Sequence, residues 1–203
     1  GLVNIGDGPK WVCGSDVLSS TNDCVVYSIG SHWDFSFEYA VHKIAPLCEI
    51  HTFDGTLNVN KLRRFNNKFR ERNIHFHAWN IVAECDEGAT KFPSKCVAET
   101  LKTLNHEKVR ISWFKIDCEG CEHTVMPKFF YSSVQIDEIM IEVHDPNATS
   151  LEKLFRTLRD ADMMMFHKER NHWGCQGYSC VEYSFISQEH ARRVLHNYLS
   201  AST

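Results

Sequence analysis

The most informative segment of the chain is Trp113-Phe114-Lys115-Ile116-Asp117-Cys118-Glu119-Gly120-Cys121-Glu122. Its first half is a short, very apolar run, which is typical of a buried strand. Its second half carries several ionisable groups and a glycine, as expected where a strand ends in a loop. In an open α/β sheet, ligands bind at the carboxyl ends of the strands. The segment therefore predicts a buried parallel strand that ends at a functional site.

Outward from this segment, short apolar runs alternate with helical patterns. We predict seven strands, at residues 24–29, 48–53, 74–79, 111–116, 136–143, 163–167 and 181–186. Apolar residues at helical spacing predict helices around residues 37–44, 62–69, 97–104, 151–158 and 191–198. Strands that alternate with helices indicate βαβ units and a mainly parallel sheet. Residues 1–203 are predicted to form a single domain, on which an irregular N-terminal segment, residues 1–23, packs.

Composition narrows the class of protein. The 203 residues are enough for one α/β domain with a sizeable core, and 43% of them are apolar. The net charge of −4 gives no electrostatic reason to expect a nucleic-acid partner. No apolar run approaches the roughly 20 residues that a membrane span requires. We therefore expect a globular domain without a membrane span in this chain.

Nine cysteines are a high count, and an odd number leaves at least one unpaired within a monomer. Cys24 and Cys48 lie in strand-like runs and are predicted to be buried thiols. The segment 118–121 has C-x-x-C spacing without a second such pair, so a zinc site is only the alternative interpretation. Cys175 and Cys180 flank a turn and suit a local disulfide. The count favours an oxidising compartment with about one to three disulfides.

The first three strands end in candidate cofactor contacts. Gly30 follows the first strand and permits a tight turn near a ligand, although a lone glycine is a weak signal. Asp54 ends the second strand, where a carboxylate can accept hydrogen bonds from the ribose hydroxyls of an adenosine cofactor; the alternative is a simple Asp-Gly turn. Asn80, near the end of the third strand, is a candidate adenine contact. The full set of predicted cofactor contacts is Ser28, Gly30, Ser31, Asp34, Asp54, Asn80 and Asp117.

Candidate catalytic residues follow the fourth and fifth strands. They are Asp117, Glu142 and His144, and strand alternation places the last two on one face. A histidine beside carboxylates suits general-base work near neutral pH. The same three groups are also candidate ligands for a divalent metal. Glu119 and Glu122 fit either a site or an ordinary acidic first turn of a helix.

Residues 115–122 are similar to the K-x-D-x-E-G-x-E signature of FkbM-type methyltransferases. More closely, the chain resembles the methyltransferase-like family that includes vertebrate methyltransferase-like protein 24. The matching stretches are residues 8–13, 24–30, 34–38, 76–80, 114–122, 141–144, 166–171 and 182–185. The resemblance implies a Rossmann-like, class I methyltransferase fold with helices on both faces of the sheet, S-adenosylmethionine as cofactor, and a secretory-pathway or extracellular location, with the cytoplasm as the alternative.

The expected activity is methyl transfer to an O–H or N–H acceptor, which is a small molecule, glycan or peptide. Asp54 would hold the ribose, Asp117 would bridge the cofactor and acceptor sites, and His144 or Glu142 would take the acceptor's proton. One alternative is a catalytically degenerate binding module of the secretory pathway, because bulky Trp33 stands where FkbM-type relatives have further glycines. Another is a nicotinamide-dependent oxidoreductase, although the acidic fourth-strand end would repel a pyrophosphate.

Overall fold

The computed structural model describes residues 2–6, 8, 10–19, 24–58, 60, 62, 69, 71–85, 91–144, 147–171, 175 and 179–200. Its centre is a seven-stranded sheet in the order β10-β11-β9-β8-β3-β4-β5. The strands are β3 (Val25–Ile29), β4 (Glu49–Phe53), β5 (Ile74–His77), β8 (Arg110–Ile116), β9 (Gln135–His144), β10 (Met163–Arg170) and β11 (Cys180–Ser187). Only β11 runs antiparallel to its neighbours. The predicted fold class is confirmed.

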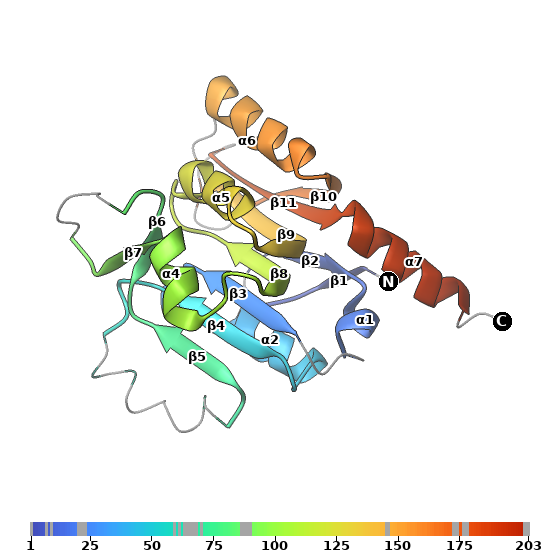
Figure 1. Ribbon diagram of the computed structural model, residues 1–203, viewed down its shortest axis with the longest axis horizontal. Helices are drawn as coiled ribbons and strands as arrows, with labels where there is room; N and C mark the ends of the chain where they lie inside the picture. The colour runs from blue at the N-terminus through green and yellow to red at the C-terminus, as the bar shows by residue number, and fades with distance from the viewer. Residues whose placement is uncertain are drawn as a thin grey trace.

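Helices cover both faces of this sheet (Figure 1). Helices α4 (Val97–Leu104), α5 (Glu122–Tyr131) and α6 (Ala148–Asp160) pack on one face, and α2 (Ser36–Ile44) packs on the other. The helix α7 (Gln188–Ser200) follows β11. Because both faces are covered, the central strands are buried on both sides, and this explains their almost continuous apolar sequence. Most of the helix predicted at 62–69, including Phe65, lies outside the described residues.

The N-terminal segment is not irregular, and that prediction is wrong. It contains the antiparallel pair β1 (Leu2–Asn4) and β2 (Trp11–Cys13), followed by the short helix α1 (Ser15–Ser19). Strand β2 lies against β9 and β11, where the Cys13 amide donates to Glu138 Oε2 at 2.6 Å. Strands of three residues are too short for a periodic pattern to register in the sequence. The segment therefore packs on the carboxyl-terminal half of the sheet through short elements that no sequence pattern predicts.

The third predicted strand is also shorter than expected. It ends at His77, and Asn80 opens a separate strand, β6 (Asn80–Val82). Strand β6 pairs in parallel with β7 (Ser94–Cys96) in a two-stranded sheet outside the main one. No helix in the described part of the chain is both long and apolar enough to cross a bilayer.

Eight of the nine cysteines form disulfides in the structure. The pairs are Cys24–Cys48, Cys85–Cys96, Cys118–Cys121 and Cys175–Cys180, and Cys13 is free. The predicted local bridge at Cys175–Cys180 is confirmed. The prediction of buried thiols at Cys24 and Cys48 is wrong, because the parallel pairing of β3 with β4 brings their Cα atoms to 4.8 Å.

Candidate functional site

A cavity of about 530 Å³ opens at the carboxyl ends of β3, β4 and β8, beside β6. The strand order reverses between β3 and β8, which is where open α/β sheets bind ligands. The volume lies within the range of small-molecule sites. Six of the predicted cofactor contacts line it, namely Gly30, Ser31, Asp34, Asp54, Asn80 and Asp117. The tertiary structure therefore brings together residues from four separate chain segments.

Ser28 is the exception among the predicted cofactor contacts. It is fully buried within β3 and is not among the described residues that line the cavity. Alternate residues of a strand face opposite sides of a sheet, so Ser28 points to the side of α2, where Glu38 is also buried. The structure therefore does not bring Ser28 together with the other predicted cofactor contacts.

Gly30 is required by the backbone at the floor of the cavity. Its φ of +79° lies in the left-handed region that favours glycine. A Cβ atom placed on Gly30 would lie 1.7 Å from the carbonyl oxygen of Asp117. The Gly30 amide also donates to Phe53 O at 2.9 Å, and the Asp117 amide donates to Ile29 O at 3.0 Å. The ends of β3, β4 and β8 are thus held in direct backbone contact.

Asp54 holds the loop that follows β3, a role that sequence reasoning missed. Its Oδ2 accepts from the His32 amide at 2.7 Å, and its Oδ1 accepts from the amide and hydroxyl of Thr56 at 2.8 and 2.6 Å. The loop needs such support, because His32 and Trp33 both have positive φ angles, of 43° and 69°. A carboxylate has about four acceptor positions, so little capacity is left on Asp54 for a ribose.

Asn80 supports the opposite wall of the cavity. Its side-chain Oδ1 accepts from the Gly55 amide at 2.7 Å, and its backbone amide donates to Pro93 O at 2.8 Å. These bonds connect the turn after β4 with the small β6–β7 sheet. The side chain thus lines the cavity and also fixes the geometry of its rim.

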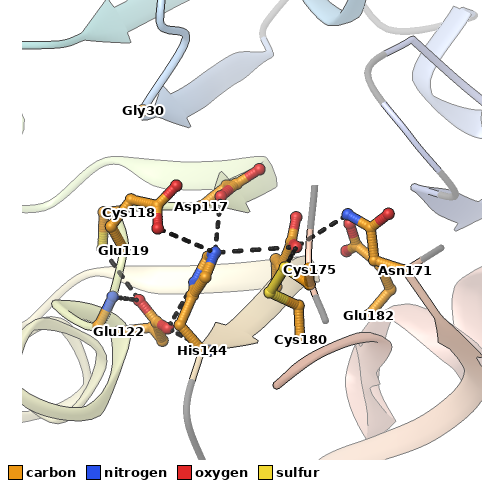
Figure 2. Close-up of polar contacts among 12 residues, drawn as sticks. Gly30, Asp117, Cys118, Glu119, Glu122, His144, Asn171, Cys175, Cys180 and Glu182 are labelled. Atoms are coloured by element: carbon orange, nitrogen blue, oxygen red, sulfur yellow. Dashed lines mark hydrogen bonds and ion pairs between the residues drawn. A yellow bond between two sulfur atoms is a disulfide. The ribbon is translucent and has the colours of Figure 1, made fainter. Parts of the chain in front are cut away.

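The predicted catalytic residues converge, as Figure 2 shows. The imidazole of His144, at the end of β9, lies in a ring of carboxylates. Its Nδ1 is 3.0 Å from Glu122 Oε1, and its backbone amide donates to the same oxygen at 2.7 Å. Its Nε2 is 3.7 Å from the nearest carboxylate oxygens of Asp117, Glu119 and Glu142. Glu122 is completely buried and positions the ring, so it is more than an acidic residue in the first turn of α5.

This ring of carboxylates decides the protonation of His144. Burial alone would lower the pKa of the imidazole, but the hydrogen bond to Glu122 and the charges of Glu122, Asp117 and Glu142 raise it to about 9. His144 therefore carries a proton at neutral pH. A protonated imidazole has no free lone pair, so this is not the form that a general base or a metal ligand requires.

Lys10 is the functional residue that sequence reasoning did not find. It comes from the N-terminal segment, yet its side chain is 1% exposed among the acidic strand ends. It forms an ion pair with Glu182 and lies 3.6 Å from both Asp117 and Glu142. The sequence held only indirect evidence for this residue. Three carboxylates lie in or beside apolar strands, and buried carboxylates require a buried cation as partner.

Lys10 and burial give the three neighbouring carboxyl groups different pKa values. Burial raises the pKa of Glu182 to about 8, even though Lys10 acts to lower it. Burial likewise raises the pKa of Asp117 against the charge of Lys10. For Glu142, Lys10 and the hydrogen bond from Asn171 outweigh burial and lower the pKa. Carboxyl groups with pKa values pushed apart at a cavity wall are typical of functional sites.

The group of donors that contains the disulfide does not suit a metal. Ligand atoms of Glu142, His144, Cys175 and Cys180 lie within 4.8 Å of one another. The two sulfur atoms, however, are joined in a disulfide and cannot serve as thiolate ligands. The group therefore keeps only Glu142 and His144 as donors, fewer than the three or four protein ligands of zinc sites. The donor set that the sequence suggested, Asp117, Glu142 and His144, stays a prediction.

Comparison with known proteins gives the class of the domain. Residues 2–187 match the family model described as a methyltransferase domain. The structure resembles fibrillarin from Aeropyrum pernix, solved with natively bound S-adenosylmethionine, at a TM-score of 0.50 and 11% identity over 85% of this chain and 73% of that chain. It resembles an rRNA methylase from Streptococcus thermophilus at a TM-score of 0.50 and 9% identity, over 85% and 93% of the two chains. Such low identities show a shared fold alone, and no curated protein sequence matches significantly. On the strength of the family match, the chain belongs to the methyltransferase domain family.

Proposed function

We propose that the protein is an S-adenosylmethionine-dependent methyltransferase that acts on an O–H or N–H group. The observation that carries the proposal is the cavity at the strand-order reversal, whose floor is the Gly30–Asp117 backbone contact. Glycine is obligatory at that contact, because a side chain there would collide with the Asp117 carbonyl and push the ends of β3 and β8 apart. Family membership supplies the class of reaction.

The residues that line the cavity fit the parts of this cofactor. The loop at Gly30, Ser31 and Asp34 offers backbone and polar side-chain groups for the charged methionine portion. Asp54 is assigned to the ribose, which would replace the long 3.5 Å hydrogen bond from the Ser31 hydroxyl at Oδ2, and Asn80 is assigned to the adenine side of the cavity. The bound sulfonium supplies an activated methyl group, and the protein's task is to align the acceptor with it.

Asp117 is the best candidate to receive the acceptor's proton. Of the three predicted catalytic residues, it is the one that lines the cavity. Burial raises the pKa of its carboxyl group above the usual value, which makes Asp117 a stronger base than an exposed carboxylate. S-adenosylmethionine would supply the activated methyl group, and Asp117 would take the acceptor's proton. His144, protonated and 3.7 Å away, would orient Asp117 and stabilise its anionic form.

The same proposal covers the class of acceptor and the cellular compartment of the protein. Four disulfides suit an oxidising environment, which supports the secretory pathway or the extracellular space. The net charge of −4 favours a small molecule, glycan or peptide over a nucleic acid as acceptor. The K-x-D-x-E-G-x-E pattern at residues 115–122 is consistent with a place near the FkbM-type methyltransferases.

One observation favours a second candidate, a binding module without turnover. Protein groups already occupy most of the acceptor positions of Asp54, and Trp33 adopts a strained φ in the loop where the methionine portion would lie. Such a loop could bind the cofactor weakly or hold it out of line for transfer. The two candidates differ in whether S-adenosylhomocysteine forms.

Calorimetric titration with S-adenosylmethionine and S-adenosylhomocysteine, followed by an assay for S-adenosylhomocysteine release in acceptor pools, tests both. We expect micromolar binding to the wild type and to Asp117→Asn, with release only by the wild type. Asp160→Asn, on the exposed surface of α6, is the control and should match the wild type. Binding without release would favour the binding module, and no binding would contradict both candidates.

A further inference from the structure

A second group of reactive side chains lies outside the cavity, on the face of the sheet that α4 covers. Glu49 and His51 alternate on β4, and His75 and His77 alternate on β5. The register pairs His51 with His75, so all four side chains share one face. His106, directly after α4, packs edge-on against His51 at 4.9 Å between ring centroids. The methyltransferase site uses none of these residues.

Three of these residues direct ligand atoms to a common point. Glu49, His51 and His106 each offer one ligand atom, and the atoms lie within 4.8 Å of one another. Glu49 Oε1 is 3.0 Å from His51 Nε2 and 3.7 Å from His75 Nε2. Ligand atoms bound tetrahedrally to zinc at about 2.1 Å lie about 3.4 Å apart. The two separations from Glu49 Oε1 bracket that value, and the ligand atom of His106 lies within 4.8 Å of those of Glu49 and His51, so small side-chain shifts would complete a coordination sphere.

The other ring nitrogens have partners that would orient the ligands. His51 Nδ1 is 2.8 Å from His77 Nε2, and His106 Nδ1 is 2.8 Å from the Tyr27 hydroxyl. Metal-bound histidines almost always use their second nitrogen in such a hydrogen bond, which fixes the tautomer and the ring orientation. Here these bonds leave the Nε2 atom of each ring for Glu49 and the common point.

One buried atom is left without a satisfactory partner. His51 Nε2 has no hydrogen bond within the described structure, although Glu49 Oε1 is only 3.0 Å away, because the carboxylate is out of line with the ring nitrogen. Ligand atoms that converge on an ion point at the ion and not at one another. A metal between the two residues would satisfy the imidazole nitrogen and the carboxylate together.

The exposure of the group also suits a metal. The side chains of Glu49 and His75 are 40% and 38% exposed, which provides a path for an ion from solvent.

We propose that Glu49, His51 and His106 bind a divalent transition metal, with zinc as the ion that this donor set fits best. Two imidazoles and one carboxylate are a known zinc ligand set, and His75 is placed to become a fourth ligand. The site would tie β4 and β5 to the end of α4. It is independent of the methyl-transfer proposal, because its residues do not line the cavity.

The test uses untagged protein prepared without chelators or reductants. We expect elemental analysis to find one zinc per chain, and chelator-stripped protein to bind Zn²⁺ and to give the visible spectrum of Co²⁺ in a nitrogen and oxygen environment. His51→Ala and Glu49→Gln should weaken zinc binding at least tenfold. His196→Ala, on the exposed surface of α7, is the matched control and should bind as the wild type does.

Glu49→Gln keeps the size of a partly exposed side chain, so it keeps the proposal testable if His51→Ala does not fold. Added zinc should raise the midpoint of thermal unfolding of the stripped wild type but not that of Glu49→Gln. Zinc binding that is unchanged in Glu49→Gln, or a wild type that takes up no stoichiometric zinc and no Co²⁺, would overturn the proposal.

Discussion

Replacement of Lys10 by methionine tests the most unusual feature of the acidic strand ends. Methionine is an unbranched apolar side chain that fills the space of the lysine methylene groups. It removes the charge that pairs with Glu182, Glu142 and Asp117. Removing one partner of a buried ion pair costs about 3–5 kcal/mol, because the remaining charge stays buried and unpaired. Folded domains have only about 5–15 kcal/mol of stability in total. We therefore expect Lys10→Met to lose a large part of its free energy of unfolding at pH 7.

The loss should depend on pH in a defined direction. Without Lys10, the pKa values of Glu182 and Asp117 rise further above their unfolded values of about 4, and the lowered pKa of Glu142 rises as well. A carboxyl group with a raised folded-state pKa contributes stability below its unfolded pKa and loses it as the pH rises towards the folded-state pKa. The difference between variant and wild type should thus be small near pH 4.5 and grow up to about pH 8.

Urea unfolding between pH 4.5 and 8 measures this difference, and thermal unfolding should show a drop of about 6–20 °C at pH 7. Lys153→Met, on the exposed surface of α6, is the control and should stay within about 0.5 kcal/mol of the wild type. A second variant, Lys10→Met with Glu182→Gln, should recover part of the loss. A destabilisation below about 1 kcal/mol, or one that does not vary with pH, would refute the account of Lys10.

Three further predictions concern the cavity and the core. Gly30→Ala should abolish cofactor binding in calorimetry while the far-ultraviolet circular dichroism stays native, because its Cβ would collide with the Asp117 carbonyl; retained affinity would contradict this. The pKa of His144 is raised to about 9, so its stabilising contribution is complete below about pH 6.5 and is lost as the pH rises through 9. His144→Gln should remove roughly 3 kcal/mol of that pH-dependent decline in urea titrations, and an unchanged slope would argue against a charged imidazole. Phe129→Ala should cost about 3–5 kcal/mol in urea titrations, because the ring is fully buried; a loss under about 1 kcal/mol would mean the core collapses to fill the space.

Much of the fold could be predicted from the sequence because it rests on local patterns. Strands β3 and β8 are apolar on both faces, and the apolar stripe of α2 repeats at helical spacing, so each element is visible within its own residues. The carboxyl ends of parallel strands meet at one edge of a sheet. For this reason the sequence alone was enough to assign Gly30, Asp54 and Asp117 to one site. Ser28 was misplaced because it stands one residue before Ile29, on the opposite face of β3.

Other features depend on contacts between distant segments, which no local pattern records. Lys10 meets Glu182 across 172 residues. The protonated state of His144 requires Asp117 and Glu122, from the end of β8 and the start of α5, to lie beside a ring that β9 carries next to Glu142. The histidine group at Glu49 and His51 exists only because β4, β5 and the end of α4 are adjacent.

The sequence by itself thus determined the strands of the central sheet, most of the helices that cover it, the mainly parallel pairing and the edge at which the cavity lies. Hydrophobic periodicity and turn residues act over a few neighbours, and these properties follow from them. Only the tertiary structure decided which side chains form buried ion pairs, which cysteines far apart in the sequence pair and which protons stay bound. Those properties depend on distance and burial, and both arise when segments far apart in the sequence pack together.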